Sequence, residues 1–202
     1  MPSQVDTSKE AALQMVGRTV VNFQRLEHNL KLAARLGPLR GTIQKVQKDI
    51  SKRHERAANL TLGQAIQAWL EYCYSQPSTT QETPDLFDVS VQISFSLESD
   101  PASQAQHASA LSALLSARNE LIHSRLATFK WESPEACAAL VADLKQVNTS
   151  ISEQIEYTSA LLKAIADLHK EHAQALAVQF SSPTSGAADT MPNTSFERTR
   201  EG

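Results

Sequence analysis

Three polar residues whose side chains can handle a phosphate ester lie close together: Arg118, Asn119 and His123. In a helix, Asn119 and His123 are four residues apart and share one face, and Arg118 projects about 100° round from Asn119. Arginine can grip a phosphate with two parallel hydrogen bonds, and histidine can transfer a proton near neutral pH. These groups, with Asn119 as the orienting amide, suffice for metal-independent RNA cleavage. Spacing alone favours the alternative, in which Arg118 and His123 make only structural hydrogen bonds.

A second candidate site is a basic segment over residues 39–60. Its six basic residues oppose only Asp49 and Glu55, which leaves a local excess of four positive charges. One interpretation is a solvated helix face, and the other is a surface that contacts RNA phosphates. The basic residues are Arg40 and the five predicted RNA-binding residues Lys45, Lys48, Lys52, Arg53 and Arg56.

Signals for metals and cofactors are weak. His169 and His172 are three apart and could share a metal on a helix, but no third ligand is evident, so no metal site and no cofactor are predicted. His107 lies near an expected helix start without an obvious partner. Cys73 and Cys137 lack metal-ligand spacing and are interpreted as reduced, buried thiols.

The composition predicts a mainly α protein. Hydrophobic residues make up 41% of the 202 positions and aromatic residues only 5%, which favours packed helices. The net charge of −3 excludes a globally basic nucleic-acid-binding protein, so any RNA site must be local. The polar N-terminus and the absence of a run of 18 apolar residues predict a cytoplasmic protein with no membrane partner.

Helical spacing predicts helices over residues 7–36, 39–60, 61–74, 102–126 and 133–176, the last long enough to bend near Asn148. Thr61 and Ser133 are suited to capping helices, and Pro101 fits a first turn. The apolar stripe of the first helix consists of Leu13, Val16, Val20, Phe23, Leu26, Leu30 and Ala34.

Residues 88–97 alternate apolar and polar side chains, which predicts a small β insertion. Its expected pairing partner is either residues 127–131 or another chain. Two regions are expected: a helical domain over residues 1–180 and a disordered tail over 181–202, rich in Ser, Thr, Pro and Gly. The end of the tail, residues 192–200, resembles translated read-through of a bacterial repeat or integron recombination site, which would place the gene on a mobile element.

The pattern Arg118-Asn119-x-x-x-His123 resembles the signature of the HEPN superfamily: Arg, a polar residue, then His. The surrounding residues 114–117 and 121–122 fit that context, and residues 20–36 are similar to the first helix of bacterial members. The resemblance covers roughly residues 11–176, and only the motif within it is specific.

This resemblance implies a helical bundle that forms a homodimer, with two motifs facing each other across one composite site. It implies a metal-independent endoribonuclease of toxin or defence type, in which His123 transfers the proton, Arg118 contacts the phosphate and Asn119 supports them. An antitoxin protein is a possible further partner. Two alternatives remain: a non-catalytic dimerisation, RNA-binding or protein-binding module, and a metal-dependent helical enzyme.

Overall fold

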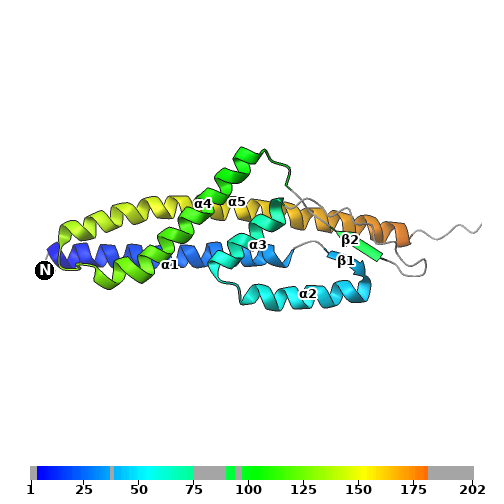
Figure 1. Cartoon of the computed structure of the whole chain (residues 1–202), viewed down its shortest axis with the longest axis horizontal. Helices are drawn as coiled ribbons and strands as arrows, with labels where there is room; N and C mark the ends of the chain where they lie inside the picture. Colours follow the sequence, from blue (N-terminus) through cyan, green and yellow to red (C-terminus); the bar gives the residue numbers. More distant parts are fainter. Residues whose placement is uncertain (1–3, 37–38, 75–89, 94–96, 182–202) are drawn as a thin grey trace, which may run out of the picture. The chain divides into compact units, whose positions relative to one another are not determined.

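The protein is mainly α-helical, as predicted. The structure is a computed structural model that describes residues 4–36, 39–74, 90–93 and 97–181. It divides into two compact units, Met1–Ile165 and Ala166–Gly202, and the last helix contributes to both. The described elements, drawn in Figure 1, are α1 (Gln4–Arg35), β1 (Leu39–Thr42), α2 (Ile43–Ala58), α3 (Leu62–Tyr74), β2 (Ser90–Ile93), α4 (Pro101–Glu120) and α5 (Pro134–Ser181).

The predicted helix caps are confirmed at two positions. Thr61 and Gln64 form a reciprocal capping box at the start of α3, with Thr61 N donating to Gln64 Oε1 at 2.9 Å. The Ser133 hydroxyl accepts from Ala136 N at 3.2 Å at the start of α5. Short polar side chains at these positions satisfy amides that have no partner within the helix.

The expected start of the second helix at residue 39 is wrong, because residues 39–42 form β1. Gly41 has φ +130°, a conformation that side chains rarely adopt, and a Cβ there would meet Lys45 Cδ at 2.8 Å. Thr42 then caps α2 by accepting from Lys45 N at 3.4 Å. The glycine and the cap together delay the helix to Ile43.

The partner expected for the β insertion, residues 127–131, is also wrong. Strand β2 pairs antiparallel with β1, with Leu39 opposite Ile93 and Thr42 opposite Ser90. Residues 126–128 instead form a short 3-10 turn. The remainder of the predicted strand lies outside the described residues except Leu97, whose N–H donates to Cys73 O at 2.8 Å.

The main core of the first unit lies where α1, α3, α4 and α5 meet. Trp69 of α3 is fully buried there, and Phe23, Leu26 and Leu30 of α1 pack into the same cluster as predicted. Leu13 was expected on the same buried stripe, but its side chain is 49% exposed. The buried face of α1 is therefore set by its neighbours as well as by its spacing.

A second apolar cluster positions the candidate site. Ala12 of α1, Leu121 beyond the end of α4, and Cys137, Leu140 and Leu144 of α5 are all buried together. The first part of α5 runs parallel to α1 (Figure 1), and Asn22 Nδ2 donates to Asn148 Oδ1 at 2.7 Å between them. The helix continues through Asn148 without a break.

No stretch of the described helices is long and apolar enough to cross a membrane.

Candidate functional site

The motif lies where α4 changes from an α-helix to a π-turn. Helix α4 ends at Glu120, and Leu121–Arg125 form the π-turn that carries His123. The turn is held at both ends, because Leu121 is buried against Ala12 and Arg125 Nη2 donates to Asp143 Oδ2 at 2.6 Å. A continuous helix to residue 126 was expected, so this widening is a feature that helical spacing did not reveal.

Arg118 and Asn119 form a hydrogen-bonded pair at the end of α4. Arg118 Nη1 donates to Asn119 Oδ1 at 3.0 Å, and the Arg118 side chain is half-buried while Asn119 is exposed. The amide is therefore placed to orient the guanidinium. Four N–H groups of the guanidinium remain for other acceptors.

His123 is exposed on the π-turn. Within the part of the chain that the structure describes, its ring has no hydrogen-bond or ion-pair partner. An exposed imidazole without an internal partner can exchange a proton with a bound molecule or with solvent. The three residues thus present a hydrogen-bonded guanidinium, an exposed amide and an exposed imidazole.

A groove of about 430 Å³ runs between α4 and α5 beside the motif. Small side chains of α4 such as Ala113 and Ala117 line it, together with the Arg125–Asp143 ion pair and Gln154 of α5. Arg118, Asn119 and His123 are not among its lining residues. The motif is consequently a surface site at the flank of a groove, and a single chain does not enclose it.

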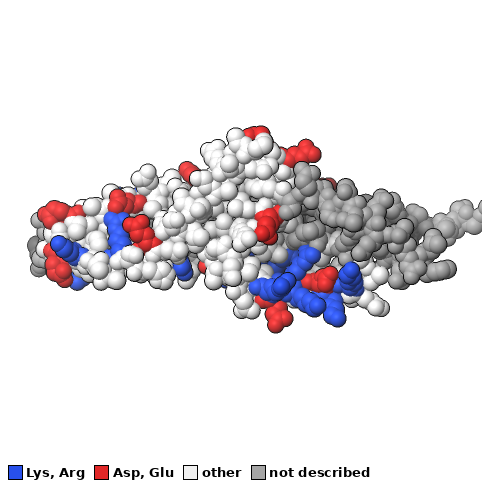
Figure 2. Space-filling view, in the orientation of Figure 1, with Lys and Arg blue, Asp and Glu red and all other residues white. Residues whose placement is uncertain are grey.

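The predicted RNA-binding residues of α2 are mostly on its exposed side. Lys45, Lys48, Lys52 and Arg56 are exposed, and Figure 2 shows Lys and Arg side chains gathered over this helix. Arg53 is half-buried and lies near Tyr72, where its charge partly offsets the burial that raises the pKa of Tyr72 to about 12. The side chain of Arg40 lies outside the described residues.

The motif and the basic helix are not brought together. The π-turn packs at Ala12 near the beginning of α1, whereas α2 reaches the later part of α1, where Lys31 Nζ donates to Ala58 O at 3.3 Å. At 1.5 Å per residue, Ala12 and Lys31 are roughly 28 Å apart along α1. The two candidate surfaces are therefore packed against different parts of α1.

Sequence reasoning missed the surroundings of His107. Its Nδ1 is 2.8 Å from the Tyr74 hydroxyl, and the Tyr157 ring lies 4.7 Å away edge to face, with Trp69 on another side. Burial lowers the pKa of His107 below its usual 6.5, although the nearby Gln154 side chain opposes this shift. The available signal was the spacing of His107 with Leu111 and Leu114, which places the histidine on the buried face of α4.

The remaining candidates stay separate. Cys73 and Cys137 are buried free thiols, and burial raises the pKa of Cys73 to about 12. His172 is exposed in the second unit and His169 is partly exposed there. Among the described residues, no group of three or more His, Cys, Asp or Glu side chains could hold a metal ion.

No family model, curated protein or solved structure matches the chain.

Proposed function

We propose that the protein is a metal-independent endoribonuclease whose site is built from Arg118, Asn119 and His123. The observation that carries the proposal is the exposed His123 on a π-turn directly after the oriented Arg118–Asn119 pair. π-turns are rare and occur frequently at functional sites. The resemblance of these three residues to the HEPN signature supports the same chemistry.

The proposed reaction uses the ribose 2′-hydroxyl as nucleophile. His123 accepts the 2′ proton, the 2′ oxygen bonds to phosphorus, and the bond from phosphorus to the 5′ oxygen breaks, leaving a 2′,3′-cyclic phosphate. The 5′ oxygen takes its proton from the His123 imidazolium of a second copy. Arg118 stabilises the charge that develops on the phosphoryl oxygens. Because one chain leaves the motif open at its surface, a composite site between two copies would provide both the acid and the base.

One observation favours a second candidate, a non-catalytic dimerisation or binding module. The Arg118 guanidinium is half-buried and already bonded to Asn119, as expected for a residue that packs an interface. In that case Arg118→Ala would weaken self-association and there would be no nuclease activity to lose.

The first prediction separates these functions. His123→Ala should reduce RNA cleavage in the presence of a metal chelator by about 100-fold or more, because proton transfer typically contributes at least that factor. Cleavage is measured in single-turnover assays on single-stranded RNA. The matched control is His172→Ala, which removes an exposed histidine of α5 and should cleave like the unchanged protein.

Because His123 is exposed, its variant should keep the helical circular dichroism of the parent. Full cleavage by the folded His123→Ala protein, or no cleavage by the unchanged protein, would reject the nuclease. In a toxin or defence role, expression would also arrest growth, and the same substitution would relieve the arrest.

A further inference from the structure

One face of α1 carries an unusual exposed stripe. Its residues recur at spacings of three and four and therefore lie along one side of the helix. All are exposed, and the two apolar members, Leu13 and Val21, are 49% and 52% exposed. The α1 stripe consists of Asp6, Glu10, Leu13, Gly17, Val21, Gln24 and His28.

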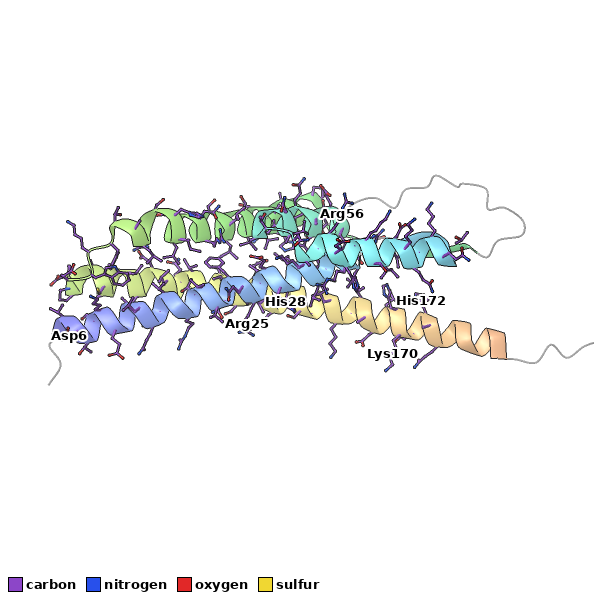
Figure 3. The ribbon with its side chains drawn as sticks, turned by 90° about the horizontal axis from the view of Figure 1, so that it is seen from below. Asp6, Arg25, His28, Arg56, Lys170 and His172 are labelled. Carbon is purple, nitrogen blue, oxygen red and sulfur yellow. The ribbon has the colours of Figure 1, made fainter. Side chains whose placement is uncertain are left out.

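The α1 stripe is arranged symmetrically about Gly17. Leu13 and Val21 lie four positions before and after it, Asp6 and His28 eleven positions before and after it. Acidic groups thus occupy the beginning of the stripe, while His28 and the adjacent Arg25 occupy its second half, as Figure 3 shows for the labelled residues. If two copies align antiparallel at Gly17, the acidic end of each meets the basic end of the other.

We propose that the α1 stripe is an isologous interface between two copies of this chain, crossing antiparallel at Gly17. A two-fold axis makes each surface patch contact itself, so the patch must be self-complementary. Here the apolar centre meets an apolar centre, and Glu10 lies opposite Gln24 of the second copy, beside that copy's Arg25. Arg18, the charged residue nearest the two-fold axis, projects roughly 100° away from the middle of the stripe and therefore lies outside the contact.

The shape of the surface agrees with this pairing. A hollow of about 340 Å³ lies beside the second half of the α1 stripe, lined by Val21 and His28 of α1 and by Ile155 and Ser159 of α5, among others. Leu13 is exposed on the first half. The two-fold axis places Leu13 of one copy opposite Val21 of the other, at the edge of that hollow. Each copy therefore contributes Leu13 and one hollow to the contact.

Gly17 is explained by the same contact. A Cβ at this position would meet nothing within 4 Å in the single chain, so alanine would fit there. Glycine in the middle of a helix weakens the helix relative to alanine. A glycine at the point where the two helices cross lets their backbones approach closely. The dimer contact therefore explains the glycine at position 17, whereas the contacts of the single chain do not.

This interface goes beyond the proposed function and does not depend on it. Ala12, which packs with Leu121 of the π-turn, projects roughly 140° from the middle of the α1 stripe. The α1 contact therefore uses a different side of the helix from a contact that would bring two His123 side chains together. Its test measures association, so its failure is distinguishable from a loss of cleavage.

The second prediction concerns association of the full chain. In sedimentation velocity the unchanged protein should show twice the mass of Val21→Asp, because in the variant a buried carboxylate would face Leu13 of the second copy. The matched control is Val5→Asp, the same change at an exposed valine of α1 roughly 120° away from the stripe. It should keep the mass of the unchanged protein, and both variants should keep their helical circular dichroism.

Charge reversal and cross-linking test the orientation. Glu10→Arg and Arg25→Glu should each weaken the dimer, and the double variant should restore it. Leu13→Cys alone should not cross-link to itself, because the two residues would be about 12 Å apart, whereas Leu13→Cys with Val21→Cys should form an intermolecular disulfide. A monomeric unchanged protein, a Val21→Asp protein with the same mass as the unchanged protein, or self-linking by Leu13→Cys alone would overturn the proposal.

Discussion

At the scale of single residues, His107 shows how a polar group is accommodated in an aromatic environment. His107 belongs to α4, and two other helices contact it: the Tyr74 hydroxyl of α3 is hydrogen-bonded to its Nδ1, and the Tyr157 ring of α5 packs edge to face against it. Burial in these surroundings disfavours the imidazolium and lowers the pKa of His107. The neutral ring therefore links α3, α4 and α5.

The third prediction follows from that pKa. As the pH falls below about 6.5, the unfolded chain binds a proton at His107 while the folded chain does not until a lower pH. The free energy of unfolding should therefore decrease across this window. In urea unfolding at about pH 7.5 and about pH 5.5, His107→Gln should show a smaller pH dependence than the unchanged protein. The exposed His54→Gln should keep the full dependence, and an equal dependence in the His107 variant would contradict the assignment.

At the scale of elements, the parallel contact of α1 and α5 depends on the buried amide of Asn148 as well as on apolar side chains. Asn148 Nδ2 donates to Thr19 Oγ1 at 2.7 Å and to Leu144 O at 2.8 Å, and Asn148 Oδ1 accepts from Asn22. These bonds specify the register of the two helices, because an amide displaced by one turn would be buried without partners.

The fourth prediction tests this register. Asn148→Ala should lower the free energy of unfolding by about 1–3 kcal/mol, because the polar groups around it lose their partner in a buried site. Thr149→Ala, the exposed neighbour on the same helix, should change it by less than about 0.5 kcal/mol. Urea unfolding of the two variants measures both values. Equal effects would show that Asn148 does not contribute specifically to the contact.

At the scale of the first unit, the basic side of α2 and the π-turn are separate surfaces along α1. If the protein acts on RNA as proposed, α2 contributes affinity while the motif contributes chemistry. Positive charges that contact phosphates strengthen binding and make it sensitive to salt.

The fifth prediction separates those contributions. Lys48→Gln with Lys52→Gln should weaken RNA binding and reduce its salt dependence, because up to two phosphate contacts are lost. Single-turnover cleavage at saturating RNA should stay unchanged. The matched control removes two exposed lysines of α5, Lys145→Gln with Lys163→Gln, and should leave binding unaltered. Loss of cleavage at saturation in the α2 variant would place these lysines in the reacting site.

The sequence by itself determined the mainly α class, the helix caps at Thr61 and Ser133, and the buried positions Phe23, Leu26 and Leu30. Capping and helical spacing act within a few residues, so their signals can be seen in the chain itself. The same spacing wrongly predicted that Leu13 is buried. The elements packed against a helix decide which of its sides is covered. Leu13 lies on the side of α1 that the described neighbours leave open.

Only the tertiary structure decided the pairing of β1 with β2, the π-turn under His123 and the enclosure of His107. Each depends on groups far apart in sequence: β1 on a strand about fifty residues later, the π-turn on Ala12 and Asp143, and His107 on Tyr74 and Tyr157. Such contacts form only when the tertiary structure brings residues distant in sequence together. For this reason the motif residues could be named from the sequence, while their exposure and surroundings could not.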